Sequence, residues 1–142
     1  MRMGVDFPKI NRKILHERHR DKVGVFGFAL QKAAYTLDGT VAYTCLTLAE
    51  RAAIGAEAKA HPAGVVDYLI NIRGVDTALY VSESEPGVFE ASMRSRIANV
   101  AEVAHGFGGG GHKAAAGCTI REKSAGDAVE RILGKLVEKI KE

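Results

Sequence analysis

Four consecutive glycines, Gly108 to Gly111, precede His112 and Lys113 in the stretch GFGGGGHKAAAG. Glycine loses more backbone entropy on folding than any other residue, so such a run indicates an unusual turn or a ligand close to the main chain. The N–H groups of successive glycines can converge on one anion, and a helix beginning just after them would add its positive end. Phosphate is the natural ligand of such an assembly. A glycine-rich turn that packs tightly against a neighbouring segment is the alternative.

Two better-known glycine motifs do not fit the same stretch. Gly106, Gly108 and Gly111 satisfy G-x-G-x-x-G, but the dinucleotide-binding fingerprint follows a strand, and here a helix is expected before it. The phosphate-binding loop of nucleotide triphosphatases needs a lysine and then Ser or Thr after its last glycine, and neither requirement is met. The pattern therefore favours a phosphate site of a more general kind.

A second segment, SMRSR, carries arginines at the end of an expected strand. Strand alternation puts Ser92, Arg94 and Arg96 on one face. Arginine suits bidentate binding of phosphate, although an exposed strand face with solvated arginines is the alternative. Ser92 and His112 could be imagined as a nucleophile and its base, but no acid that would orient the histidine is evident.

Composition and cysteine content limit the classes of protein to which the chain can belong. The 142 residues suffice for one domain, and the net charge of +3 is compatible with an anionic ligand. Cys45 and Cys118 lack the spacing of a metal site, which indicates a reducing, cytoplasmic setting. No apolar run is long enough to span a membrane. No metal site is expected, because no ligand pattern with carboxylates is formed by His16, His19, His61 and His105.

Hydrophobic periodicity predicts the elements that must position these residues. Two strands at 76–83 and 88–95 form an antiparallel hairpin around the turn sequence SEPG, and a further strand is expected at 40–48 after a turn at Asp38 and Gly39. The segment 114–122 is expected to form a short helical turn and then a strand. Helices are expected at 6–22, 22–36, at the start of 49–60, within 62–75, at 99–107 with Asn99 as N-cap, and at 124–142 with Ser124 as N-cap. The fold class is therefore α/β, with a small mixed β-sheet flanked by helices in one domain.

The basic residues of the first helix have two interpretations. Lysines and arginines within 6–22 could touch a phosphate backbone, but Glu17 and Asp21 interrupt the run, which favours a solvated helix face.

The segments SMRSR and NVAEVAHGFGGGGHKAAAGCTI closely resemble the C-terminal DHH-associated domain of DHH-family phosphoesterases. The resemblance covers nearly the whole chain, with residues 1–36 as a helical linker segment and 37–142 as the substrate-binding domain. The bacterial nanoRNase and pAp phosphatase family, which hydrolyses short oligoribonucleotides and 3′-phosphoadenosine 5′-phosphate (pAp), is the most similar subgroup. RecJ-type exonucleases and cyclic-dinucleotide phosphodiesterases share the motif more loosely.

The resemblance implies a division of labour between two domains. In that family a DHH domain binds two manganese ions, which activate water against a phosphoester. This chain has no Asp-His-His triplet, so the resemblance implies a substrate-binding half that holds no cofactor and is inactive alone. The opening MRMGVDFPKI resembles the segment that follows a DHH domain, and a fragment of a longer enzyme is therefore expected.

The resemblance also assigns roles to individual residues. Arg94 would hold a substrate phosphate or the terminal nucleotide, and the glycine backbone would line the cleft. His112 would donate to the scissile or a neighbouring phosphate when the domains close, with Asn99 a lesser candidate. The expected substrate-binding residues are Arg94, Ser95, Arg96, Gly108, Gly109, Gly110, Gly111, His112 and Lys113.

The resemblance also implies partners for the chain, and two other functions are alternatives to the one that it implies. The expected partners are a nucleotide or short single-stranded RNA and the DHH domain of the same protein, with homodimerisation left open. A free-standing nucleotide or nucleic-acid binding module is an alternative, although 6% aromatic residues and no tryptophan disfavour extended stacking on bases. A domain of the kind associated with tRNA synthetases fits the GGGGH and MRSR motifs less well.

Overall fold

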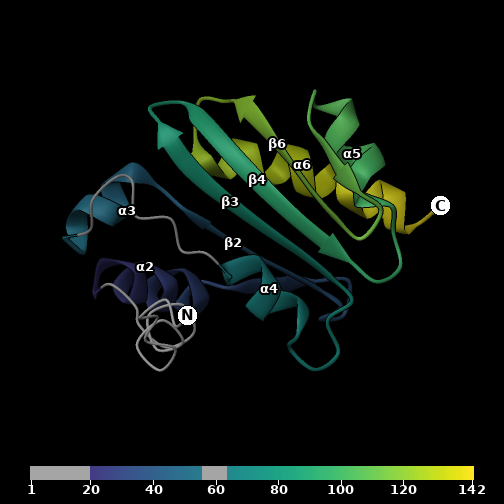
Figure 1. Cartoon of the computed structure of the whole chain (residues 1–142), viewed down its shortest axis with the longest axis horizontal. Helices are drawn as coiled ribbons and strands as arrows, with labels where there is room; N and C mark the ends of the chain where they lie inside the picture. Colours follow the sequence, from purple (N-terminus) through teal and green to yellow (C-terminus); the bar gives the residue numbers. More distant parts are fainter. Residues whose placement is uncertain (1–19, 56–63) are drawn as a thin grey trace, which may run out of the picture.

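The computed structural model describes residues 20–55 and 64–142, so the helix expected at 6–22 lies almost entirely outside the described residues. The described chain forms one six-stranded mixed sheet with helices on both faces (Figure 1). This confirms the expected α/β fold with a single small domain. The elements are α2 (Arg20–Gln31), β1 (Ala34–Thr36), β2 (Val41–Leu46), α3 (Leu48–Ala53), α4 (Val65–Ile70), β3 (Thr77–Glu85), β4 (Val88–Ser95), α5 (Val100–Gly106), β5 (Gly110–His112), β6 (Ala115–Arg121) and α6 (Ala125–Ile140).

The strand order across the sheet is β1-β2-β3-β4-β6-β5. Strands β2 and β3 are parallel, and the connection between them carries α3 and α4, as a parallel crossover requires. The other neighbouring pairs are antiparallel. Strands β3 and β4 form the expected hairpin, and its turn uses Gly87 at a φ of +77°. The sheet therefore places β4, β6 and β5 side by side.

Each face of the sheet has its own core. Helices α5 and α6 cover one face, while α2 and α4 cover the other face over β2 and β3 (Figure 1). Strand β3 is buried on both faces, which explains its nearly continuous run of buried residues. The core under α5 and α6 contains Leu79, Val81, Phe89, Met93, Val100, Ile120, Ile132 and Leu136. The core under α2 and α4 contains Val25, Ala29, Ala42, Leu46, Val65, Leu69, Ala78 and Tyr80.

The last two helices begin where the sequence predicts. The Asn99 side chain accepts a hydrogen bond from the Ala101 N–H at 3.1 Å, and the Ser124 hydroxyl accepts one from the Asp127 N–H at 3.1 Å. Helix α6 then buries Ile132 and Leu136 on its apolar stripe. Neither described range contains a helix that is long and apolar enough to cross a membrane.

The helix expected at 22–36 ends earlier in the structure than the sequence predicts. Helix α2 stops at Gln31, and residues Ala34–Thr36 form β1, which pairs antiparallel with β2. Leu37 and Asp38 have positive φ angles in the turn between these strands. The alanines before Tyr35 favour a helix locally, but pairing with β2 determines their conformation.

The helical turn expected at the start of 114–122 is absent. Residues Gly110–His112 and Ala115–Arg121 form two antiparallel strands, and Lys113 and Ala114 form the turn between them. Pairing of β6 with both β4 and β5 overrides the helix propensity of the alanines. The helix end that was expected to help bind phosphate is therefore not present.

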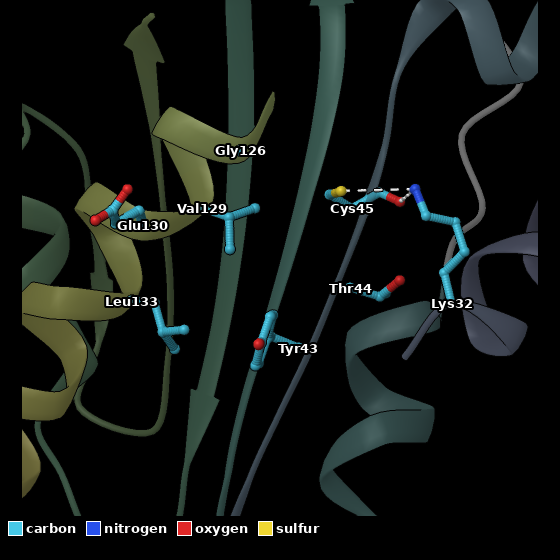
Figure 2. Close-up of a pocket in the computed structure, with 8 residues that line it drawn as sticks. All are labelled: Lys32, Tyr43, Thr44, Cys45, Gly126, Val129, Glu130 and Leu133. Carbon is cyan, nitrogen blue, oxygen red and sulfur yellow. Dashed lines mark hydrogen bonds between the residues drawn. The ribbon is translucent and has the colours of Figure 1, made fainter. Parts of the chain in front are cut away.

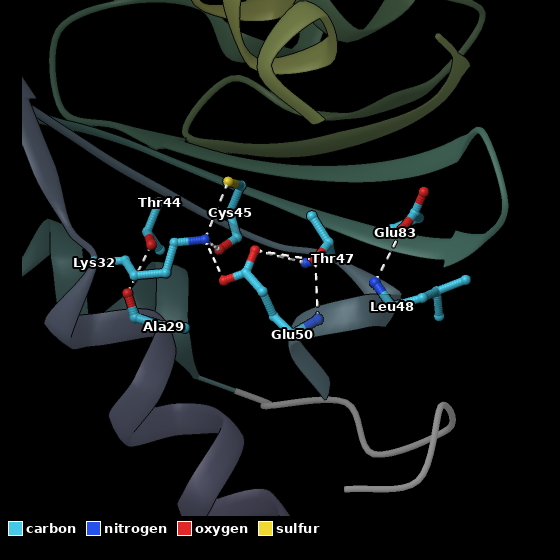
Figure 3. Close-up of polar contacts among 8 residues, drawn as sticks. All are labelled: Ala29, Lys32, Thr44, Cys45, Thr47, Leu48, Glu50 and Glu83. Atoms are coloured by element: carbon cyan, nitrogen blue, oxygen red, sulfur yellow. Dashed lines mark hydrogen bonds and ion pairs between the residues drawn. The ribbon is translucent and has the colours of Figure 1, made fainter. Parts of the chain in front are cut away.

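Lys32 directly follows α2 and contacts both β2 and α3 (Figure 3). Its ammonium donates to the Cys45 carbonyl at 3.1 Å and pairs with the Glu50 carboxylate at 2.5 Å. Glu50 also closes a capping box with Thr47 at the start of α3. We call the set of Lys32, Cys45 and Glu50 the lysine junction. It holds the end of α2 and the start of α3 against β2.

Candidate phosphate-binding site

Arg94 and His112 project from the same face of the sheet, with one residue between them. Arg94 of β4 pairs with Ala115 of β6, and Ala115 pairs with His112 of β5. Directly paired residues share a face, and neighbouring strands are roughly 4.8 Å apart, so the two backbones are roughly 10 Å apart. An arginine and a histidine can both reach a ligand that lies over Ala115. We call Arg94, His112 and Ala115 the arginine–histidine corner.

The core assignments show which face carries this corner. Arg94 also pairs with Ala78 of β3, which belongs to the core under α2 and α4. Helices α5 and α6 cover the opposite face. Among the described elements, α4 is the one that reaches β4 on the side of Arg94, and the surface beyond it is left exposed or half-buried at β4, β6 and β5. We call this surface the open face; it includes Ser92, Arg94, His112, Ala115 and Gly117.

Backbone hydrogen bonds attach the glycine hairpin to the arginine strand. The Ser95 N–H donates to the Ala114 carbonyl at 3.1 Å, and the Val100 N–H donates to the Lys113 carbonyl at 2.9 Å. The turn of the β5–β6 hairpin is therefore bonded both to the end of β4 and to the first turn of α5. This is how the two predicted segments meet, although 18 positions separate Arg94 from His112.

The glycine run also has a packing function. The N–H groups of Gly108 and Gly109 donate to carbonyls at the end of α5, at 3.0 and 2.8 Å. A Cβ on Gly109 would overlap the Gly117 carbonyl oxygen and lie 2.7 Å from the Cys118 Cα. Gly111 has a φ of +146°, and a Cβ there would lie 2.6 Å from the Ala115 oxygen. These glycines allow the hairpin to close against β6, the alternative that the sequence left open.

Helix α4 holds both arginines of the SMRSR segment. The Arg94 Nε donates to Asp67 Oδ1 at 2.9 Å, and its Nη1 donates to the Met93 carbonyl at 2.9 Å. The Arg96 Nη2 donates to the Ile70 carbonyl at 3.2 Å and to Asn71 Oδ1 at 3.1 Å. Sequence reasoning missed this role of α4. The available signal was the pair of polar residues at positions 67 and 71, which lie on the same side of a helix.

The remaining predicted residues are placed differently. Ser95 is buried, and its hydroxyl bonds to the Thr77 hydroxyl at 2.9 Å and accepts from the Ala98 N–H at 2.9 Å. It therefore fastens the end of β4 and does not join Arg94 on the open face. Lys113 is exposed in the hairpin turn, where its charge acts on Glu102 of α5.

Charges behind the hairpin connect α5 to α6. Lys139 bonds to the Glu102 carboxylate and holds its pKa below the usual range, with smaller contributions from His105 and Lys113. The Glu102 and Glu142 carboxylates in turn raise the pKa of Lys139. Beneath the glycines, burial raises the pKa of the Cys118 thiol. The shifted pKa values of Glu102 and Lys139 thus reflect an ion pair between α5 and α6, and that of Cys118 reflects its burial.

A pocket of about 350 Å³ lies between β2 and α6, away from the arginine–histidine corner (Figure 2). Tyr43 and Cys45 contribute from β2, and Val129 and Leu133 contribute from α6. Lys32 stands at one end, with its Nζ 3.7 Å from the Cys45 sulfur. None of the substrate-binding residues expected from the sequence lines this pocket.

The described part of the chain has no metal-type cluster. Within residues 20–55 and 64–142, no group of three or more His, Cys, Asp and Glu side chains is arranged to hold a metal ion.

Solved structures of other proteins share the fold of this chain. The chain superposes on an exopolyphosphatase-related protein from Bacteroides fragilis with a TM-score of 0.78 and 24% identity, covering 98% of this chain and 42% of that one. For a pGpG-specific phosphodiesterase from Vibrio cholerae the TM-score is 0.62 and the identity 16%, over 96% of this chain and 47% of that one. The chain spans less than half the length of either protein, and at these identities the likeness shows a shared fold. The DHHA1 domain family matches residues 38–142, and the chain therefore belongs to that family.

Proposed function

We propose that this chain is the substrate-binding part of a DHH-family phosphoesterase and that it binds phosphate groups of a nucleotide or short RNA at the arginine–histidine corner. The observation that carries the proposal is the strand register, which puts Arg94 and His112 on one face with Ala115 between them. Membership of the DHHA1 family supports the phosphoesterase context.

The chemistry of the corner suits an oxyanion. Two nitrogens of Arg94 bond to Asp67 and Met93, and its Nη2 has no hydrogen bond within the described residues. That nitrogen and the second hydrogen of Nη1 can donate to phosphate oxygens. His112 is exposed and can supply a further donor. The small residues Ala115 and Gly117 between these groups leave space for a ligand close to the backbone.

Cleavage is assigned to a separate DHH domain of the same protein. The two metal ions that the family resemblance implies would be held in that domain. This chain would bind and orient the substrate and would be inactive alone. Short oligoribonucleotides and pAp are the proposed substrates. The structural neighbours are named for polyphosphate and pGpG chemistry, which also involves phosphate-rich compounds.

An NMR titration of the nitrogen-15-labelled chain tests the proposal. We expect pAp and a diribonucleotide to shift the signals of Gly110 to Lys113 and of Arg94, with an affinity of roughly millimolar strength because half of the cleft is missing. Replacing Arg94 or His112 by alanine removes charge-assisted or polar hydrogen bonds and should weaken binding roughly tenfold or more.

Arg121 provides the matched control. It is exposed on β6, on the same face of the sheet as Arg94 but at the opposite end of the pairing between β4 and β6. Arg121→Ala should leave pAp binding unchanged, whereas equal losses in Arg94→Ala and Arg121→Ala would indicate non-specific attraction to positive charge. Absence of any shift, both alone and with the DHH domain and manganese added, would refute the proposed site.

A further inference from the structure

Arg94 is held at two of its nitrogens before any ligand binds. Its Nε donates to Asp67 Oδ1 at 2.9 Å, and its Nη1 donates to the Met93 carbonyl at 2.9 Å. The guanidinium group is planar, so two bonds at different nitrogens determine the direction of its remaining edge. The Arg94 side chain is 29% exposed, while that of Asp67 is 59% exposed. The contact therefore lies at the margin of the open face.

The packing of α4 determines where Asp67 points. Val65, Val66 and Leu69 of α4 are buried in the core. Successive residues are roughly 100° apart around a helix, so Asp67 and Tyr68 lie on the outer side, each beside a different neighbour. The Tyr68 ring meets the Phe26 ring of α2 edge-on, with centroids 5.8 Å apart. The core and this ring contact together orient α4 so that Asp67 faces β4.

A second polar residue, Asn71 at the C-cap of α4, continues the same row. Asn71 lies one turn after Asp67, and its Nδ2 donates to the Asp67 carbonyl at 2.8 Å. Its Oδ1 accepts from Arg96 Nη2 at 3.1 Å. Asp67 in α4 and Asn71 at its C-cap thus contact the two arginines of the SMRSR segment.

We infer that Asp67 is a positioning residue, whose carboxylate holds the Arg94 guanidinium in the orientation that binds a phosphate-bearing ligand. The inference rests on the proposed function. A long side chain that is ordered in advance loses less conformational entropy on binding. The negative charge of Asp67 opposes an anionic ligand, so its two effects have opposite signs. Asparagine separates them, because it keeps the Oδ1 acceptor and removes the charge.

Three variants of the 142-residue chain test this role by pAp titration. Asp67→Ala removes the acceptor and should weaken binding roughly three- to tenfold, the effect of one side chain that must be ordered on binding. Asp67→Asn should bind as tightly as the wild type or more tightly. Asp127→Ala is the matched control, because Asp127 is also exposed and occupies the same third helical position, in α6. It should leave the affinity unchanged.

The NMR signal of the Arg94 Nε–Hε group distinguishes a loss of Arg94 positioning from a general loss of fold stability. In the free protein we expect a sharp, slowly exchanging signal in the wild type, in Asp67→Asn and in Asp127→Ala, and a broadened one in Asp67→Ala. Unfolding curves of the variants identify any general loss of structure.

The outcomes separate the two proposals. A wild type that binds pAp, together with an Asp67→Ala variant of equal or higher affinity, overturns the positioning role and leaves the proposed function intact. A wild type that does not bind pAp under any of the conditions above overturns both. Weakened binding in Asp67→Ala and in Asp67→Asn to the same extent would also contradict the role of the acceptor atom.

Discussion

Arg94 of the arginine–histidine corner and Lys32 of the lysine junction are both cations paired with a carboxylate from another part of the chain, Asp67 and Glu50 respectively. The cationic side chains are almost equally exposed, at 29% for Arg94 and 32% for Lys32. Their remaining contacts differ. The Lys32 ammonium bonds to Glu50 and to the Cys45 carbonyl and lies 5.6 Å from the centre of the Phe28 ring. Its charge is thus used to hold α2, β2 and α3 together (Figure 3).

Arg94 retains donors that the fold does not use. Its guanidinium bonds to one carboxylate and to the carbonyl of the preceding residue, and His112 projects from the same face two strands away. Lys32 also lines a pocket of about 350 Å³ (Figure 2), yet its ammonium is already engaged in the contacts above. The two regions differ in the donors left over after folding, and for that reason we propose the arginine–histidine corner as the binding site and a structural role for the lysine junction.

Loss of a packing glycine should disturb the scaffold of the corner more than any other change considered below. Gly109→Ala places a Cβ against the backbone of β6, and such overpacking should lower the free energy of unfolding by about 3 kcal/mol. Gly106→Ala is the control, since a Cβ there meets nothing within 4 Å and the φ is ordinary, and it should be neutral or slightly stabilising. Denaturant unfolding measures both. Equal stability of the two variants would mean that the hairpin does not need glycine for its packing.

The next prediction tests whether the lysine junction is purely structural. Lys32→Met keeps the aliphatic stem but loses the hydrogen bonds and the ion pair, and should cost about 1 kcal/mol of stability for a partly exposed group. Its pAp affinity should equal that of the wild type. Lys135→Met, at a side chain 61% exposed on α6, should change neither quantity. A loss of pAp binding in Lys32→Met would mean that the lysine junction is not purely structural and also contributes to ligand binding.

The smallest effect depends on pH and concerns the attachment of α5 to α6. Lys139 lowers the pKa of Glu102 in the folded protein, so this carboxylate adds stability at neutral pH that is lost as the pH falls through the lowered pKa. Glu102→Gln should therefore unfold at a slightly lower temperature than the wild type at pH 7, and the difference should narrow in acid and in high salt. A difference that persists unchanged near pH 3 would point to a cause other than charge.

Much of the fold could be predicted because local signals agreed with the final structure. The β3–β4 hairpin has a turn sequence between two β-rich runs, and Asn99 and Ser124 precede their helices as N-caps. The errors at Ala34–Thr36 and at 114–116 share one cause. These alanine-containing segments favour a helix when considered alone, but pairing with β2 in the first case, and with β4 and β5 in the second, determines their conformation.

Most of the local elements, the family motif and the two segments that carry the candidate phosphate ligands could be predicted from the sequence. The burial of Ser95, the packing of the glycines against β6 and the contact of Asp67 with Arg94 across 27 positions became visible in the three-dimensional structure alone. The physical reason is that strand order and register depend on the burial of both sheet faces at once. Such long-range pairing brings together side chains whose proximity no local pattern encodes.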